Sequence, residues 1–148
     1  MSSPFSAPPR LLGVRLTDTD YDSPRHELGS VILGVDGVRY RYVLAGEAIA
    51  QYDAVDYTAA YTASVTDADD FAFGVAQTAI ASGDYGWIAE AGVVIAKLTG
   101  SSSAGQTLAR DCTVGATLNV VTAGDGAEVP YGIVLVGESG GSGTILLF

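Results

Sequence analysis

The sequence is poor in the residues that build cross-linked, basic or nucleophilic sites. Its 148 residues include one lysine (Lys97), one histidine (His26) and one cysteine (Cys112). A single cysteine excludes an intramolecular disulfide framework. Seven basic residues against 17 acidic ones give a net charge of −10. Such a chain repels phosphate backbones and lacks the basic patch that anionic membranes attract, so we expect no nucleic acid and no membrane among its partners.

Long apolar runs are missing as well. The longest runs, such as residues 133–136 and 145–148, are far too short to span a membrane. The first ten residues show no charged start followed by an apolar stretch, so no signal peptide is expected. The hydrophobic fraction is nevertheless 48% and the charged fraction only 16%, which is too apolar for a disordered chain. The length fits one compact domain, or one domain with an arm.

Charge and proline are unevenly distributed along the chain. Residues 1–44 hold five arginines and five acids, whereas residues 45–148 hold two basic residues and twelve acids, which accounts for the whole net charge of −10. Four of the five prolines precede residue 30. We therefore predict an extended N-terminal arm at 1–27 and an acidic, β-rich body at 28–148. A disordered tail at 1–27 is the alternative, since termini are often poorly ordered.

The predicted arm carries apolar and basic side chains that would be exposed unless another protein covered them. We expect residues 1–27 to dock on another chain rather than on their own body. Burial of apolar side chains must supply most of this contact, because exposed ion pairs contribute only about 0–1 kcal/mol each. The predicted interface residues are Arg10, Leu11, Leu12, Val14, Arg15 and Leu16.

The body shows the pattern of short strands separated by turns. Residues 31–33 and 38–44 predict a hairpin around Asp36-Gly37, a strong two-residue turn signal. Further strands are expected at 49–57, 71–78, 85–90, 92–98, 106–110, 116–122, 131–136 and 144–148. Clusters of Gly, Asp and Ser lie between them, which favours an all-β fold, a small barrel or sandwich. The alanine-rich residues 57–65 are the one helix candidate.

An internal repeat is suggested by two pairs of similar segments. Residues 45–55 match residues 104–114 at their Ala, Gly, Ala and Val positions. Residues 73–76 and 131–134 share the order aromatic, Gly, β-branched, small, and this places Gly74 opposite Gly132. Continued without a gap, the alignment places Trp87 opposite Ile145, so Trp87 is predicted to lie in the core. We predict a duplicated β unit with repeats at 45–90 and 104–148.

Catalytic and metal-binding signals are weak. His26 lies in the predicted arm without a nearby nucleophile, and we interpret it as a solvated loop residue. Cys112 has no Cys or His at metal-ligand spacing, so a small core residue is expected. The triplet Asp18-x-Asp20-x-Asp22 resembles the start of a calcium loop, but Ser23 and Gly29 stand where that loop needs Gly and Glu.

Two further loops are predicted to be turns without a binding role. The acidic residues 67–70 are expected to form a solvated turn. The glycine-rich residues 137–143 lack the following helix and lysine of a phosphate-binding loop, so a turn before a last strand is expected. We predict no catalytic residue, no cofactor and no metal.

Three passages of the body resemble tailed-phage capsid decoration (cement) proteins and related small virion proteins. The first is Leu28-Gly-Ser-Val-Ile-Leu-Gly-Val-Asp-Gly-Val-Arg-Tyr-Arg-Tyr-Val-Leu-Ala-Gly46. The second is residues 45–55, which are similar to that group's Ala-Gly-x-x-Ile-x-x-Gly-Asp-x-Val, with Tyr52 in place of the usual Gly. The third is residues 73–76 followed by Gly83-Asp-Tyr-Gly-Trp-Ile88. The resemblance covers roughly residues 28–98.

The resemblance implies a non-enzymatic protein that binds the outer surface of a phage capsid and stabilises the shell at subunit joints. It implies the major capsid protein and other copies of this chain as partners, with a homotrimer expected. It places the protein on the virion, and in the host cytoplasm during assembly. Two other classes stay open: another virion part, such as a tail or fibre adaptor, and a carbohydrate-binding β module with Trp87 and nearby tyrosines as its platform. An enzyme is the least expected class.

Overall fold

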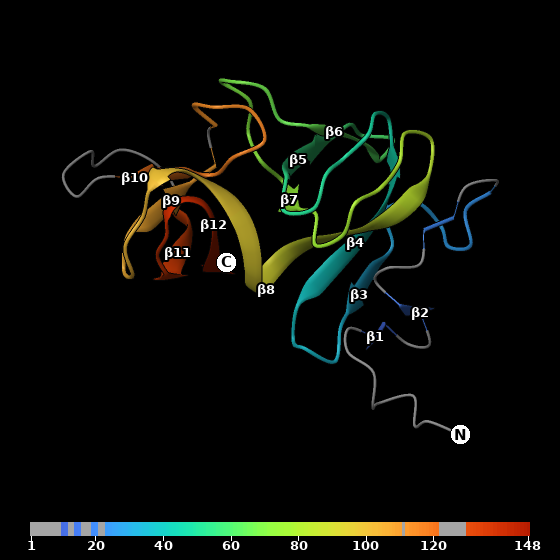
Figure 1. The fold of residues 1–148 in the computed structure, drawn as a ribbon. Coiled ribbons are helices and arrows are strands. Elements are labelled where there is room, and N and C mark those ends of the chain that lie inside the picture. Colours follow the sequence, from blue (N-terminus) through green and yellow to red (C-terminus); the bar gives the residue numbers. More distant parts are fainter. Residues whose placement is uncertain (1–9, 12–13, 16–18, 21–22, 111, 122–129) are drawn as a thin grey trace.

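The structure, a computed structural model, describes residues 10–11, 14–15, 19–20, 23–110, 112–121 and 130–148. Within these ranges the chain forms twelve β-strands and no helix, and so contains none long and apolar enough to cross a membrane (Figure 1). The strands are β1 (Arg10–Leu11), β2 (Val14–Arg15), β3 (Val31–Leu33), β4 (Arg39–Ala45), β5 (Ala54–Tyr57), β6 (Thr62–Val65), β7 (Gly74–Val75), β8 (Tyr85–Ser101), β9 (Thr107–Ala109), β10 (Asn119–Val121), β11 (Pro130–Val136) and β12 (Ser139–Leu147). The all-β prediction is confirmed.

Five strands of the N-terminal half close into a ring, which we call the N-terminal ring. The long sheet follows the order β10-β9-β11-β12-β8-β7-β5-β6-β4-β3, and β8 pairs with β4 in addition. That extra pairing connects β8, β7, β5, β6 and β4 into a closed series. Only the start of β8 takes part, because its pairs with β4 run from Leu44↔Tyr85 to Arg39↔Ala91.

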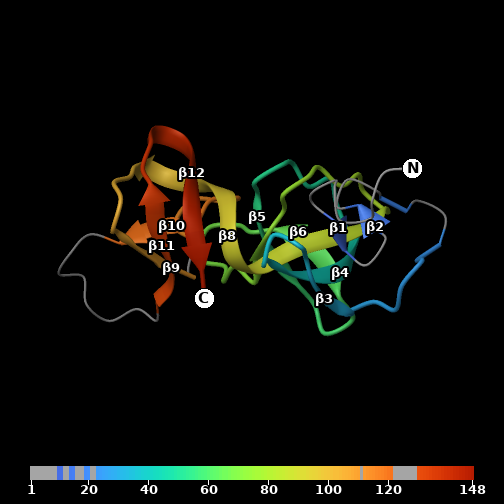
Figure 2. The same ribbon diagram turned by 90° about the horizontal axis from the view of Figure 1, so that it is seen from below.

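The second half of β8 belongs to another group of strands, which we call the C-terminal sheet. From Gly92 onward β8 pairs with β12, and β11, β9 and β10 follow in antiparallel order. A bridge between Leu98 and Leu118 brings the start of β10 back beside β8. Figure 2 shows the two groups side by side, joined by β8.

Two hydrophobic cores follow from this arrangement. The smaller core lies inside the N-terminal ring and contains Val43, Ala45, Ile49, Val55, Ala63, Ala76, Ile80 and Ile88. The larger core lies on the other face of β4 and β8, around Tyr42 and Trp87, and continues into the C-terminal sheet through Val94 and Ile145. Trp87 is completely buried, as expected. Cys112 is also buried, which confirms its interpretation as a core residue.

The predicted hairpin is confirmed, with β3 and β4 paired in the register Ile32↔Tyr40. Gly37 has a φ of 79°, which glycine adopts readily, and the Asp36 carboxylate accepts a hydrogen bond from the Val38 amide. The helix candidate at 57–65 is wrong. A turn interrupts it, Tyr61 takes a φ of 61°, and strand β6 begins at Thr62. Pairing of this segment with β5 and β4 outweighs the weak helix propensity of its alanines.

Two other predicted boundaries differ from the structure. Residues 85–90 and 92–98 form one strand, because Gly92 with a φ of 113° lets β8 change partners without ending. A Cβ at Gly92 would lie 3.0 Å from the Cα of Val38, so the close approach also favours glycine. The glycine-rich residues 139–143 form the start of β12 rather than a turn, because they pair with β8.

The segments of the predicted repeat occupy partly similar positions. Gly74 and Gly132 both lie in buried strand positions, next to β8 and to β12 respectively. Gly83 and Gly141, which the alignment also equates, both have positive φ values of 86° and 102°. The earlier parts of the two repeats differ. Residues 54–57 of the first repeat form β5, whereas the equivalent residues 113–116 of the second repeat form no strand. The duplication stays a prediction.

The last part of the predicted arm lies on the chain's own body. Asp20 and Tyr85 exchange backbone hydrogen bonds of 3.0 and 2.6 Å at the start of β8. The His26 ring packs against Tyr42 and Trp87, with centroids 5.2 and 5.3 Å apart. Asp20 and His26 therefore contact the chain's own body, and His26 is a packed residue rather than the solvated one expected. Docking of the predicted arm on another chain stays a prediction.

Candidate functional site

The six predicted interface residues fall mostly in a separate small sheet. Arg10 and Leu11 form β1, Val14 and Arg15 form β2, and these strands pair only with each other, in the register Arg10↔Arg15 and Leu11↔Val14. Leu12 and Leu16 lie outside the described residues. The structure thus gives β1 and β2 no place in the ten-stranded sheet, and the predicted interface stays a prediction.

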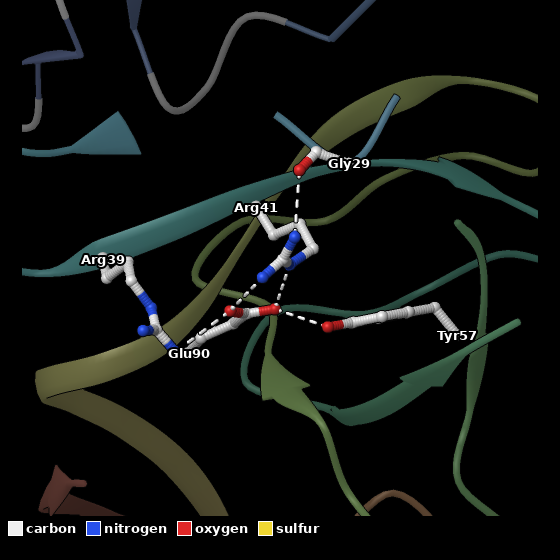
Figure 3. A network of polar contacts seen from close by, with 5 residues as sticks. All are labelled: Gly29, Arg39, Arg41, Tyr57 and Glu90. Carbon is white, nitrogen blue, oxygen red and sulfur yellow. Dashed lines mark hydrogen bonds and ion pairs between the residues drawn. The ribbon is translucent and has the colours of Figure 1, made fainter. Parts of the chain in front are cut away.

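A buried polar network lies at one end of the N-terminal ring and is centred on Glu90 (Figure 3). Only 5% of Glu90 is exposed. Its Oε1 accepts hydrogen bonds from Arg41 Nε at 2.5 Å and from the Tyr57 hydroxyl at 2.7 Å. Its Oε2 accepts one from Arg41 Nη2 at 3.2 Å and lies 3.3 Å from Arg39 Nη2. The remaining Arg41 amino group, Nη1, donates to the carbonyl of Gly29.

Strand alternation explains how these side chains meet. Arg39 and Arg41 lie on the same face of β4 as Val43, which points into the ring core, and Glu90 lies two residues from Ile88 on the corresponding face of β8. The register Arg41↔Ile88 then places the arginines beside Glu90. The network joins three strands of the ring, β4, β5 and β8.

The network raises the pKa values of Arg41 and Tyr57. The hydrogen bond to Glu90 raises the pKa of the Arg41 guanidinium above its ordinary value, despite the opposing effect of burial. Burial, followed by the hydrogen bond to Glu90, raises the pKa of Tyr57 to about 12. Tyr57 therefore stays a neutral donor at neutral pH. Because the carboxylate accepts from side chains on both oxygens, the arrangement holds strands together.

Aromatic rings lie above this network. Tyr57 contacts Tyr61 and Phe73, with ring centroids 5.6 and 5.1 Å apart. The guanidinium carbon of Arg41 lies 5.8 Å from the Tyr57 ring and 5.6 Å from the Tyr61 ring, within cation–π range. Phe73 is 39% exposed, so the end of the ring presents part of an aromatic surface to solvent.

A second polar cluster anchors Asp20 and Arg25 to the body. The Tyr42 hydroxyl donates to Asp20 Oδ2 at 2.7 Å, and Arg25 Nε lies 2.7 Å from Asp20 Oδ1. Burial, followed by the hydrogen bond to Asp20, raises the pKa of Tyr42.

Lys97 pairs with the buried Asp53 and so connects the second half of β8 to the turn before β5. The buried acids Asp20, Asp53 and Glu90 thus each have a basic partner.

The loops considered as cation sites do not gather ligands. Among the described residues there is no group of three or more His, Cys, Asp or Glu side chains placed to hold a metal ion. In the acidic turn, Asp70 Oδ2 accepts the backbone amide of Asp67 at 2.9 Å, a local contact typical of turns. Of the calcium-like triplet only Asp20 lies in the described part, where it pairs with Arg25.

Exposed apolar side chains also lie on the outer face of the C-terminal sheet, which we call the open face. Val93 and Ile95 of β8 are 55% and 36% exposed, and they alternate with the buried Val94 and Ala96. Val93 faces Leu146 of β12, which in turn faces Ile133 of β11, so apolar side chains form a row across three strands. Contiguous apolar surface of this kind is typical of interaction sites.

The polar network was missed by the sequence analysis, although a signal was present. Glu90 and Lys97 are the only charged residues of β8. A charge inside an apolar strand is costly unless it is paired, so each predicts a partner nearby. The alternation of arginine and tyrosine along β4 was recognised, but not that the arginine face would point toward the ring interior.

Comparisons with known proteins give a fold likeness. No protein-family model matches the chain, and no curated protein matches it. One solved structure that resembles it is the head fiber gp8.5 N base in bacteriophage phi29, with a TM-score of 0.57. The match covers 74% of this chain and 92% of that one, at 14% sequence identity. At this identity the likeness shows a shared fold.

Proposed function

We propose that this chain is a non-enzymatic structural protein of a phage virion that binds the outer surface of the capsid and stabilises the shell at subunit joints. The observation that carries the proposal is the fold shared with a head fiber base over 92% of that chain's length. The motifs in residues 28–98 that resemble decoration proteins point the same way. The major capsid protein and further copies of this chain, arranged as a trimer, are the proposed partners.

The open face supports a binding role. A protein that holds a shell together needs contact area, and apolar side chains arranged on a rigid sheet supply it with little ordering cost. Val93, Ile95 and Leu146 lie on such a sheet and lack cover in the single chain. We assign this face to contact with the capsid protein.

The direct test is quantitative recovery of the protein with purified capsids. We expect a fixed copy number per capsid and expect Ile95→Lys, on the open face, to reduce binding at least tenfold. Val114→Lys is the control, because Val114 is an exposed apolar residue, 56% against 36% for Ile95, in a loop outside the open face. Absence of the protein from capsids, or equal binding by both variants, would contradict this assignment.

A base for a head fibre is the second candidate, since the matched structure is itself named as one. In that case the chain attaches a projecting fibre to the head instead of covering a joint. Electron microscopy of virions labelled on this chain separates the two: a fibre rising from each labelled position supports the fibre base, and a bare label supports the decoration protein.

The carbohydrate-binding alternative loses its main support. It relied on Trp87 as part of an exposed platform, and Trp87 is completely buried in the larger core, where it packs against Tyr42. Tyr57, Tyr61 and Phe73, at the end of the ring, are partly exposed instead.

A further inference from the structure

Strand β3 is an open edge of the ten-stranded sheet. It stands last in the strand order, with β4 on one side and no strand of the described chain on the other. The Tyr42 amide donates to Ser30, and the Gly34 amide donates to Val38, so the backbone groups of these alternate residues point toward β4. In an antiparallel ladder the intervening residues point the other way. The amides and carbonyls of Val31 and Leu33 therefore face outward.

The edge also lacks the usual protection against pairing. Exposed edge strands commonly carry lysine, proline or a bulge that discourages another strand from adding to them. Here the strand is Val31-Ile32-Leu33, and its outer residues Val31 and Leu33 are 47% and 69% exposed. Both the backbone and the side chains of β3 are thus suited to accept a further strand.

Elsewhere the chain closes an edge of the same kind by itself. At Ile95 on β8 the side chain of Gln77 takes the place of a neighbouring strand. Its Nε2 donates to the Ile95 carbonyl at 2.8 Å, and its Oε1 accepts the Ile95 amide at 3.2 Å. The contrast indicates that β3 is left for a partner.

We propose that β3 receives the strand segment that carries β1 and β2 from a second copy of this chain. In the single chain β1 and β2 pair only with each other, through two residue pairs, and stay apart from the long sheet. A two-stranded ribbon of this size has marginal stability in water. Addition of a strand to an open edge satisfies the backbone groups of both elements at once.

Charge is consistent with this occupant. The segment carries Arg10 and Arg15 at the outer ends of its two strands. On the accepting side, the exposed Glu27 precedes β3 in the sequence. Asp36, after β3, already accepts hydrogen bonds from the Val38 amide and the Tyr40 hydroxyl, and Arg39 and Arg41 across the strand pair with Glu90. Glu27 is thus the counter-charge that this edge offers to an arginine-ended strand. The inference concerns the free protein and does not depend on capsid binding.

The test is cross-linking between two distinguishable copies. One preparation carries Leu33→Cys and the other, with a tag that changes its size, carries Leu11→Cys. The natural Cys112 is buried, so the unmodified protein is the control for background reaction. After mixing, a short bismaleimide linker should give a product containing one chain of each size, and much less product from either variant alone. Absence of that mixed product overturns the proposal.

A second measurement separates exchange between copies from a contact within one copy. A chain with both Leu33→Cys and Leu11→Cys that is cross-linked only to itself overturns the second-copy assignment. Sedimentation compares two variants at exposed positions, where the fold should be kept. Leu33→Lys should weaken self-association at least tenfold, whereas Val35→Lys, in the following turn and 51% exposed against 69% for Leu33, should leave it unchanged. Equal association by both variants, or a protein that stays monomeric at tens of micromolar, contradicts the proposal.

Discussion

The two halves of β8 show how differently one strand is used in this molecule. Residues 86–90 are buried without interruption, because the strand has β4 and β7 beside it and a core on each face. From Val93 to Leu98 buried and exposed residues alternate, because only one face packs on a core. Every polar group of the first half therefore needs a partner inside the protein. The second half has one face available for contact with another protein.

This difference appears in the charges of β8 as well. Glu90, in the first half, is enclosed by Arg39, Arg41 and Tyr57. Lys97, in the second half, is 37% exposed and has one acidic partner, Asp53. Substitutions in the first half should therefore act mainly on stability, and substitutions on the outer face of the second half mainly on association.

The largest expected effect comes from Glu90→Ala. Removal of the carboxylate leaves Arg41 and Tyr57 without their acceptor in a buried site, which typically costs about 3–5 kcal/mol. Urea unfolding of the variant and the parent measures the loss. Glu138→Ala is the control, because Glu138 is exposed, and a change within about 0.5 kcal/mol is expected there. Equal stability of Glu90→Ala and the parent would show that the network is not structural.

The next largest effect is expected from Gly74→Val in the N-terminal ring and Gly132→Val in the C-terminal sheet. A Cβ at Gly74 would lie 2.8 Å from the Ala89 carbonyl oxygen, and one at Gly132 would lie 2.5 Å from that of Leu146. Backbone cannot yield easily, so each variant should lose about 1–3 kcal/mol, as overpacked sites do. Melting temperatures measure the loss, with the exposed Ala104→Val as the control. Unchanged melting in both glycine variants would remove the equivalence on which the predicted duplication depends.

A smaller effect is expected at alkaline pH from Tyr57, the tyrosine of the Glu90 network. The pKa of Tyr57 is about 12 in the folded chain, above the value near 10 of an unfolded tyrosine. A raised pKa contributes stability that is complete below the unfolded value and is lost as the pH rises from about 10 to 12. Tyr57→Phe should therefore show a shallower loss of stability between those pH values in urea titrations. An identical pH slope in the variant would contradict the assignment.

The smallest effect on stability is expected from Val93→Thr on the open face. The side chain is 55% exposed and its strand keeps all its partners, so the free energy of unfolding should change by no more than about 0.5 kcal/mol. Binding to capsids should nevertheless fall, because apolar contact area is lost. A variant that loses stability but keeps binding would reverse the roles assigned to the two faces.

Local features of the fold were predictable because their causes are local. The Asp36-Gly37 turn and the alternation of tyrosine and arginine in 38–44 predict the β3–β4 hairpin correctly. The spacing of turn residues likewise predicts an all-β chain. Both predictions depend on neighbours within a few residues, which the sequence displays directly. Burial of Trp87 was expected on another ground, its alignment with Ile145 in the predicted repeat.

The boundary of the N-terminal arm was not predictable in the same way. Composition places it at residue 27, since four of the five prolines lie before that point. The structure joins Asp20 to Tyr42 and His26 to Trp87, residues that lie 22 and 61 positions apart. No local pattern signals contacts over such separations.

What the sequence by itself determined is the class of fold, the hairpin, and the requirement that Glu90 find a partner. What only the tertiary structure decided is which partner it found and which surfaces stayed open. Closure of the ring through β4 and β8 brings residues 41 and 90 together, and the change of partner at Gly92 leaves one face of β8 uncovered. These are long-range pairings, and their choice depends on the register of whole strands against one another rather than on any short stretch of sequence.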